Sequence, residues 1–372
     1  MEINRRLWLK NVGLGIAGIG MTNMNSFASP LPLVSENVFD NLEPQNNFIT
    51  LRSNENPYGP SPLARKAFAD NLTLSNRYNW EIATQLISNL AVKNNVKDEN
   101  ILLGAGSTEI LDLVAKFAAS QKGNYVIADP SYEYWTATLD SLGLKKIKVP
   151  LNADKKIDLQ AMLKAVDKDT KLVYICNPNN PTGTICERNE LVNFVNNVPP
   201  TAIVLIDEAY LEFTKQQSLS GLISTHPNIV VAKTFSKIYG LAGARIGYAI
   251  ADTTLINNLA NLQSNTNNSV SVLSKLAAIA SLKDNKFVSD CSSQNEIARK
   301  YTIDELQKLN CECIPSNTNF IYFSLTNYKK DYFQKLKDNN IEGTRIYVEQ
   351  GKWTRITVGT MQEMKQFIKA LQ

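Results

Sequence analysis

The chain has 372 residues, of which 44% are hydrophobic and 20% charged, so it is long enough to bury a full core and has an ordinary globular composition. Its 39 basic and 35 acidic residues give a formal net charge of +4 and are dispersed along the sequence, which argues against nucleic-acid binding. Five cysteines without a CxxC pair and a single histidine, His226, argue against a disulfide framework and against a metal site.

The N-terminus differs in composition from the rest of the chain. Arg5 and Arg6 precede an uncharged apolar run over residues 12–21, and small residues that suit cleavage follow at 26–28. The segment "RRLWLK" resembles a twin-arginine export signal, and the apolar run is too short to span a bilayer. We therefore expect residues 1–28 to be a signal peptide, with export to the periplasm and no stable membrane anchor. An N-terminal helix of a cytoplasmic protein is the alternative.

The middle of the chain alternates between strand and helix patterns. After a polar segment at 29–48, residues 100–119 read as a short strand, a glycine turn and an amphipathic helix. Near-continuous apolar runs then end abruptly in polar residues within 123–132, 171–183, 202–210 and 228–236. Such runs are typical of buried parallel strands, so the pattern predicts a doubly wound α/β sheet.

The pattern changes toward the C-terminus. A helix is expected at 293–309, strands at 319–325 and 353–359, a helix at 332–340, and a closing helix after them. These elements predict a smaller α+β domain. The expected division is an N-terminal arm at 29–75 that contributes to the small domain, a large domain at 76–280 and a small domain at 281–372.

Polar clusters at the ends of the predicted strands are the candidate chemical groups. Gly104 and Gly106 permit a tight turn, after which Ser107 and Thr108 can present hydroxyl and N–H groups to an anion at a helix N-terminus. In "NPNNPTG", prolines stiffen a loop that leaves Asn177 and Asn180 free to donate hydrogen bonds. Ordinary turns would explain both segments equally well.

A carboxylate closes the apolar run of residues 202–207. Asp207 would be destabilised by burial unless a cationic group faced it, and this group could be an arginine, a metal or a protonated heterocycle. Tyr210 could reach the same ligand. A structural ion pair or a helix cap is the alternative interpretation of Asp207.

The segment "KTFSKIYGLAGARIGY" contains two lysines and an arginine. Lys237 follows the strand among hydroxyls, where burial and positive neighbours would lower the pKa of its amine and suit it to imine chemistry. Lys233 is interpreted as structural. Arg245, among small residues, suits a bidentate phosphate contact.

Together these segments resemble a known family. The resemblance covers about residues 48–372 and rests on "LRSNENPYGPSP", "RYN", "GAGSTE", "DPSYEYW", "NPNNPTG", "DEAYLEF", "KTFSKIYGLAGARIGY" and "WTRITVGT". They are similar to fold-type I pyridoxal-phosphate aminotransferases of class I/II, of the histidinol-phosphate aminotransferase type. The resemblance implies a large domain whose mostly parallel central sheet has helices on both faces, a smaller α+β domain, pyridoxal 5′-phosphate as cofactor, and a homodimer with sites at the interface.

The resemblance also implies roles around the cofactor ring. Lys237 would form the Schiff base and transfer a proton, and Asp207 would pair with the pyridine N–H. Asn177 and Tyr210 would bind the phenolic oxygen of the ring. Tyr132 would stack on the ring, with its neighbours Tyr134 and Trp135 as alternatives.

Further roles concern the phosphate and the substrate. The residues implied for the cofactor phosphate are Ser107, Thr108, Thr234, Ser236, Arg245 and, from the partner subunit, Tyr78. Arg355 would bind the substrate carboxylate, and Asn54 and Asn56 would belong to a segment that closes over the substrate. Arg345 is the nearby candidate for a substrate phosphate, with an exposed surface position as its alternative.

The implied reaction is a ping-pong transfer, through aldimine and ketimine intermediates, of an amino group from an amino acid or a histidinol-phosphate-like amine to a 2-oxo acid such as 2-oxoglutarate. A second interpretation keeps the fold and makes the protein a decarboxylase or lyase of the threonine-phosphate decarboxylase type. A third is a protein that binds pyridoxal phosphate without turnover, which would not need Arg355.

Overall fold

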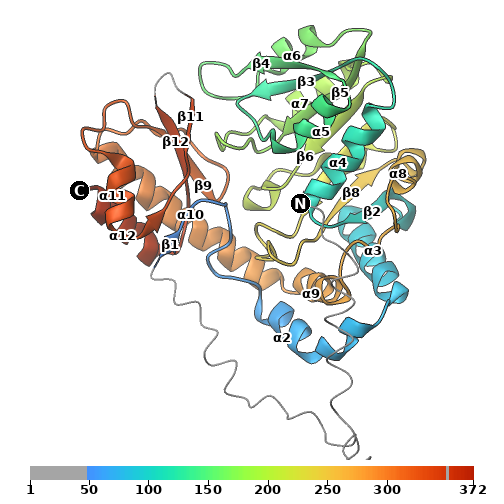
Figure 1. Cartoon of the computed structure of the whole chain (residues 1–372), viewed down its shortest axis with the longest axis horizontal. Coiled ribbons are helices and arrows are strands. Elements are labelled where there is room, and N and C mark those ends of the chain that lie inside the picture. Colours follow the sequence, from blue (N-terminus) through green and yellow to red (C-terminus); the bar gives the residue numbers. More distant parts are fainter. Residues whose placement is uncertain (1–47, 349–351) are drawn as a thin grey trace, which may run out of the picture. The chain divides into compact units, whose positions relative to one another are not determined.

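The computed structural model of the chain describes residues 48–348 and 352–372 (Figure 1). The predicted signal peptide at 1–28 lies outside the described residues. Residues 48–372 form one compact unit.

A seven-stranded sheet is the centre of this unit, in the order β2-β8-β7-β6-β5-β3-β4. The neighbours β7, β6, β5, β3 and β4 are parallel, whereas β8 runs antiparallel to both β7 and β2. The prediction of a mostly parallel sheet is therefore confirmed. The strands are β2 (Ile101–Gly104), β3 (Asn124–Asp129), β4 (Lys145–Pro150), β5 (Thr170–Cys176), β6 (Ile203–Asp207), β7 (Ile229–Thr234) and β8 (Gly247–Ala251).

Helices cover both faces of this sheet. Successive residues of a strand point to opposite faces, so each strand contributes to two apolar clusters. One cluster packs under α4 (Ser107–Ala118), α5 (Ala137–Ser141) and α8 (Thr253–Ala260). The other packs under α3 (Trp80–Asn94), α6 (Leu159–Ala165), α7 (Arg188–Asn197) and α9 (Val272–Leu282). This double cover is the doubly wound α/β arrangement that the apolar runs predict.

The C-terminal part has its own antiparallel sheet, in the order β11-β12-β9. Its elements are α10 (Asn285–Lys308), β9 (Phe320–Ser324), α11 (Tyr332–Asp338), β10 (Ile341–Glu342), β11 (Ile346–Val348), β12 (Trp353–Thr357) and α12 (Met361–Leu371). α10 begins eight residues before the helix predicted at 293–309. At the start of α12, Thr360 and Glu363 form the reciprocal hydrogen bonds of a capping box, which fixes where that helix begins.

The N-terminal segment joins the C-terminal part rather than the large sheet. β1 (Ile49–Thr50) pairs in parallel with β10, and Leu51 is buried among residues of α10, β9, β12 and α12. Figure 1 shows this blue segment beside the orange and red elements. The chain then enters α2 (Pro62–Asp70), which packs against α9. The domain boundaries given above stay a prediction.

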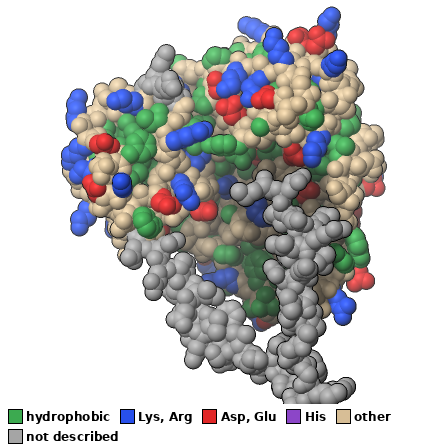
Figure 2. Space-filling model, viewed as in Figure 1, with side chains coloured by type: hydrophobic (Ala, Val, Ile, Leu, Met, Phe, Trp, Pro, Cys, Tyr) green, Lys and Arg blue, Asp and Glu red, His purple; other side chains and the backbone are tan. Residues whose placement is uncertain are grey.

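Short 3-10 helices connect several of these elements: η2 (Leu72–Asn76), η3 (Asp98–Asn100), η4 (Tyr134–Thr136), η5 (Leu211–Phe213) and η6 (Leu219–Leu222). On the face drawn in Figure 2, positive and negative side chains are mixed rather than gathered into one basic field. Among the described residues, no helix is both long and apolar enough to cross a membrane.

Candidate active site

A cavity of about 680 Å³ opens where β5, β6 and β7 end. Parallel strands place their carboxyl ends at one edge of a sheet, which is where α/β proteins bind ligands. The residues singled out from the sequence that lie on the walls of this cavity are Asn54, Ser107, Thr108, Tyr132, Tyr134, Asn180, Asp207, Tyr210, Thr234, Ser236, Lys237, Arg245, Arg345 and Arg355.

Lys237 lies in the turn that follows β7, and its Nζ donates to the carbonyl oxygen of Ser53 at 3.1 Å. Burial lowers the pKa of Lys237 to about 8, and the positive charges of Arg355 and Arg245 act in the same direction. A large share of this amine is therefore neutral near pH 8. A neutral amine is the form that attacks a carbonyl carbon.

Asp207 closes β6 and is 2% exposed. Its Oδ1 accepts from the backbone N–H of Ala209 at 3.0 Å, and its Oδ2 accepts from the hydroxyl of Tyr174 at 3.0 Å. Burial raises the pKa of Asp207 to about 6, because these hydrogen bonds and the charge of Lys237 offset the loss of solvent only in part. A cation placed in the cavity would lower the pKa of this carboxylate and so stabilise its charged form.

An anion cradle lies at the N-terminus of α4. Ser107 and Thr108 open this helix and line the cavity, and the hydroxyls of Thr234 and Ser236 are 2.9 Å apart beside them. The guanidinium of Arg245 lies so close to Gly106 that a Cβ atom there would be 2.4 Å from Arg245 Nη2. Helix N–H groups, hydroxyls and an arginine are the donor set for a phosphate.

Arg355, on β12, is 6% exposed and lines the cavity. It donates from Nη1 to Asn180 Oδ1 at 2.5 Å and from Nη2 to the carbonyl of Arg52 at 2.7 Å, and Nε has no partner in the described part of the chain. Its guanidinium also lies 5.2 Å from the ring centre of Phe320. Since neutral groups hold it, its charge is available to a substrate carboxylate.

Arg345 is solvent-exposed, but it also lines the cavity. Its guanidinium lies 5.5 Å from the ring centre of Tyr134 and 5.7 Å from that of Tyr347. Aromatic faces attract a cation without occupying its N–H donors. Arg345 is thus exposed, as its alternative interpretation states, and it also lines the cavity, so its role toward a substrate stays a prediction.

The segment of residues 52–59 contributes its first four residues to the wall of the cavity. Asn54 donates to the hydroxyl of Tyr210 at 2.9 Å, so it contacts the candidate site directly. Asn56 does not line the cavity, because its Nδ2 donates instead to the carbonyl of Ile238 at 2.8 Å. Asn56 therefore holds the segment against the turn that follows Lys237.

Two further predicted residues lie outside the cavity wall. Asn177 is buried, and its Oδ1 accepts from the backbone N–H of Cys186 at 2.8 Å. This bond leaves the NH2 group of Asn177 to act as a donor. Tyr78 is 88% exposed and does not line the cavity of its own chain.

Sequence reasoning missed several residues of the site. Tyr174 binds Asp207 from the neighbouring strand, and Arg52, Ser53, Glu55 and Tyr347 line the cavity. Tyr174 carries a readable signal, because it lies two residues before the end of β5 and so shares a sheet face with Cys176, which lines the cavity.

A lysine with a lowered pKa, a buried carboxylate and an anion cradle at the end of a mostly parallel sheet together define a fold-type I pyridoxal-phosphate enzyme. Residues 46–371 match the model of the family described as aminotransferase class I and II. The chain belongs to this family.

Curated relatives and solved structures agree with this assignment. The chain is 34% identical over 329 residues to histidinol-phosphate aminotransferase of Moorella thermoacetica, covering 87% of this chain and 84% of the relative. It is 31% identical to the enzyme of the same name from Bacillus velezensis, covering 87% and 90%. Histidinol-phosphate aminotransferase of Sinorhizobium meliloti, solved in complex with pyridoxal-5′-phosphate, has a TM-score of 0.80 and 25% identity over 95% of this chain and 98% of that one.

Proposed function

We propose that this aminotransferase uses pyridoxal 5′-phosphate to move the amino group of an anionic donor, an amino acid or histidinol phosphate, to a 2-oxo acid such as 2-oxoglutarate. The observation that carries the proposal is the placement of Lys237 in one cavity with Asp207, Arg245 and Arg355. The relatives' names supply histidinol phosphate as the first donor to test.

The cavity fits the cofactor by its chemistry. The phosphate suits the cradle of Ser107, Thr108, Ser236 and Arg245, with Thr234 beside it, and a protonated ring nitrogen suits the buried carboxylate of Asp207. Tyr132 lines the same cavity and offers a ring face for stacking. When bound, pyridoxal phosphate carries the amino group and withdraws electrons from the donor's α-carbon.

The chain's own residues then have distinct tasks. Lys237, of which a large share is neutral near pH 8, would accept a proton from the donor's α-carbon and return it, because its lowered pKa suits a general base at that pH. Tyr210 accepts hydrogen bonds from Asn54 at 2.9 Å and Asn180 at 3.3 Å, so its own O–H proton is free to donate into the cavity. The hydroxyl of Tyr210 would donate to the phenolic oxygen of the cofactor ring, and the NH2 group of Asn177 would be a second donor to that oxygen.

Two arginines suggest the substrate class. Arg355 would bind the α-carboxylate of an amino acid or a 2-oxo acid, and Arg345 would bind a second anionic group at the far end of the molecule. Histidinol phosphate has a phosphate and no carboxylate, whereas 2-oxoglutarate has two carboxylates. Histidinol phosphate and 2-oxoglutarate therefore each carry at least one anionic group that Arg355 or Arg345 could bind.

A half-reaction screen tests the proposed function. The loaded enzyme is mixed with single amino donors, including histidinol phosphate, and the loss of the cofactor's imine absorption band is followed without an acceptor. We expect loss of the band with an anionic donor and its return on adding 2-oxoglutarate. Release of carbon dioxide without this return would favour the decarboxylase alternative instead. No response to any donor would overturn the proposal.

We further propose a homodimer in which Tyr78 contributes to the partner's cofactor site. Tyr78 and Trp80 are 88% and 55% exposed, and their rings stack at 6.4 Å, which is an unusual exposure for two large aromatic side chains. Sedimentation should give twice the chain mass. Tyr78→Phe should weaken cofactor binding about tenfold without dissociating the dimer, in keeping with the loss of one hydrogen bond to a charged group. A monomer with full cofactor affinity would contradict this.

Export to the periplasm is proposed from the sequence of residues 1–28 alone. Cell fractionation tests it, with Arg5 and Arg6 both replaced by lysine as the control. We expect the unaltered chain in the periplasm and the double variant in the cytoplasm. Cytoplasmic location of both would leave the N-terminal helix alternative.

A further inference from the structure

We propose that Lys233, Glu208 and Glu212 form a clamp that positions Tyr210 in the active site. The proposal rests on the proposed function in one respect, since it takes Tyr210 to act in the amino transfer. The three clamp residues do not line the cavity, so they act through the residues that they hold.

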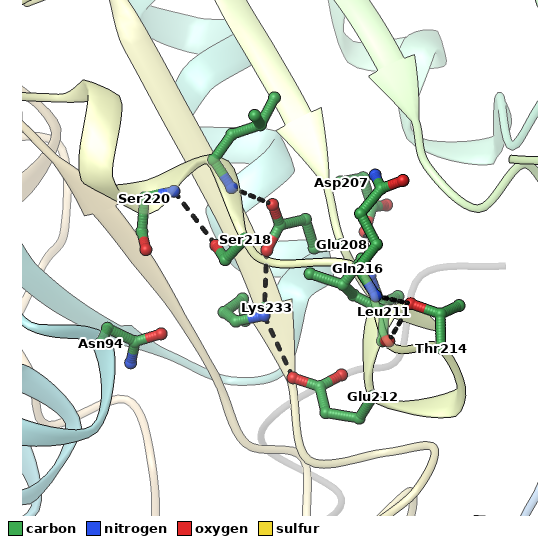
Figure 3. Close-up of polar contacts among 12 residues, drawn as sticks. Asn94, Asp207, Glu208, Leu211, Glu212, Thr214, Gln216, Ser218, Ser220 and Lys233 are labelled. Carbon is green, nitrogen blue, oxygen red and sulfur yellow. Dashed lines mark hydrogen bonds and ion pairs between the residues drawn. The ribbon is translucent and has the colours of Figure 1, made fainter. Parts of the chain in front are cut away.

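The clamp is a buried lysine shared between two carboxylates. Lys233 Nζ lies 2.9 Å from Glu208 Oε2 and 3.1 Å from Glu212 Oε1 (Figure 3). The side chains of Lys233 and Glu208 are 5% and 3% exposed, and that of Glu212 is 18% exposed. The second oxygen of Glu208 accepts from the backbone N–H of Leu219 at 2.8 Å.

The clamp lies behind the cavity because of strand alternation. Asp207 and Ala232 are partners across β6 and β7, and the backbone N–H of Glu208 continues this ladder by donating to Ala232 at 2.9 Å. Lys233 follows Ala232 within β7, and Glu208 is the first residue after β6 and continues the ladder, so their side chains point to the opposite face from Asp207. The ion pair therefore ties the two strand ends together directly behind the residues that line the cavity.

Tyr210 lies midway between the two carboxylates in the chain. Glu208 precedes it by two residues and Glu212 follows it by two, and both bind the same ammonium group. The ring of Tyr210 packs edge-to-face on Phe320 at 5.1 Å, and Lys237 Nζ lies 5.7 Å from its centre. Holding the backbone on both sides of Tyr210 thus fixes its hydroxyl relative to Lys237, which follows Lys233 by four residues.

The charges of the clamp suit a permanent contact. Burial alone would lower the pKa of Lys233, but Glu212 and Glu208 outweigh burial and hold the pKa well above its ordinary value. Lys233 stays charged over the pH range in which Lys237 titrates. A buried ion pair often adds little to the stability of a fold. We therefore assign these three charges to positioning the backbone around Tyr210 rather than to stabilising the protein.

The first experiment measures backbone opening in the full chain with bound cofactor and needs no turnover. Glu212 is the residue to change, because it is the most exposed of the three and the variant should fold. Hydrogen exchange over residues 209–214 should be about tenfold faster in Glu212→Ala than in the unaltered chain. In Glu212→Gln the exchange rate should stay within about threefold of that of the unaltered chain, because the amide oxygen still accepts from Lys233. Equal exchange in Glu212→Ala and the unaltered chain would overturn the clamp.

The second experiment asks whether the clamp acts through Tyr210. We expect Glu212→Ala to lower kcat about tenfold with KM changed less than threefold, since a small displacement of a catalytic group costs rate more than binding. In a Tyr210→Phe background the same change should lower kcat less than twofold, because the hydroxyl that it positions is gone. Fully additive losses would overturn the link to Tyr210.

Lys146→Met is the matched control, because Lys146 also bridges two carboxylates, Glu133 and Asp140, at 3.5 and 3.1 Å. It should leave exchange over residues 209–214 and kcat unchanged. If the unaltered enzyme transfers no amino group, the proposed function fails, while the exchange measurement still tests the clamp.

Discussion

Two lysines four residues apart differ in what surrounds them. Lys233 faces Glu208 and Glu212 on one side of the sheet, and its pKa is held well above the ordinary value. Lys237 faces the cavity, where burial and the positive charges of Arg355 and Arg245 lower its pKa to about 8. Residue type is the same in both cases, so the environment alone separates a structural charge from a reactive amine.

The buried carboxylate of Asp207 is expected to cost stability when the cofactor is absent. Its pKa is raised to about 6 from 3.8, so the folded state binds its proton more tightly than the unfolded state does. Stability is therefore lost as the pH rises from about 4 to about 6, and the loss above that range is about 3 kcal/mol.

Asp207→Asn should remove this pH-dependent loss of stability, because an amide does not ionise. In urea unfolding of the cofactor-free protein, the variant should be more stable than the unaltered chain at pH 8, and the difference should shrink as the pH falls from 6 to 4. A variant that is less stable at pH 8, or a difference that does not depend on pH, would contradict the account of Asp207. The same variant should lose amino transfer, since it cannot pair with a protonated ring nitrogen.

Arg355 is expected to contribute to substrate binding through its planar fork. Arg355→Lys keeps the charge but cannot hold Asn180, the carbonyl of Arg52 and a carboxylate at once. KM for the 2-oxo acid should rise about 100-fold, in keeping with the loss of one or two charge-assisted hydrogen bonds. Steady-state kinetics with the acceptor varied measures this. A KM changed less than threefold would remove Arg355 from the substrate site.

At the scale of elements, the segment from Arg52 to Gly59 links the two-stranded sheet of β1 and β10 to the site. It begins next to β1, which pairs with β10, and its carbonyl groups accept from Lys237 and Arg355. Its far end contacts the turn that follows Lys237, where Gly240 has a φ of +67°. A Cβ atom on Gly240 would lie 2.1 Å from the carbonyl oxygen of Gly59.

Gly240→Ala should therefore displace this segment. Steric overlap with backbone and a left-handed φ should together lower the free energy of unfolding by about 2 kcal/mol or more and raise KM for both substrates. Gly221→Ala is the matched control, because a Cβ there meets nothing within 4 Å. Thermal unfolding and kinetics of the two variants give the comparison. Equal behaviour would show that the approach of Gly59 to Gly240 does not constrain the site.

At the scale of the whole molecule, the sequence predicts the buried strands well, including β2 at one edge of the sheet, and misses β4 at the other edge. β3, β5, β6 and β7 are near-continuous apolar runs, because both faces of a central parallel strand are covered. β4 lies at the edge, and its lysines and exposed positions hide it from such a search. β8 starts at Gly247, inside a segment that is more easily read as the loop of Arg245.

The sequence predicts a site residue where the residue lies at or near the end of a recognisable strand. Asp207 ends β6, Lys237 lies three residues after β7, and Arg245 lies two residues before β8, which runs antiparallel to β7. Their meeting at one sheet edge therefore follows from the topology. Tyr174 and Arg52 could not be assigned in this way. The spacing of Tyr174 from Cys176 gives its sheet face, but its contact with Asp207 depends on the register of β5 with β6. The contact of Arg52 depends on the path of the N-terminal segment, which no local pattern encodes.

Identification of the residue that carries the cofactor tests the central claim most directly. Borohydride reduction of the loaded enzyme, followed by peptide mapping with mass spectrometry, fixes the cofactor to the lysine with which it forms an imine. We predict the label on Lys237 alone, and neither label nor amino transfer in Lys237→Ala. A label on Lys233 or another lysine, or full amino transfer by Lys237→Ala, would contradict the account.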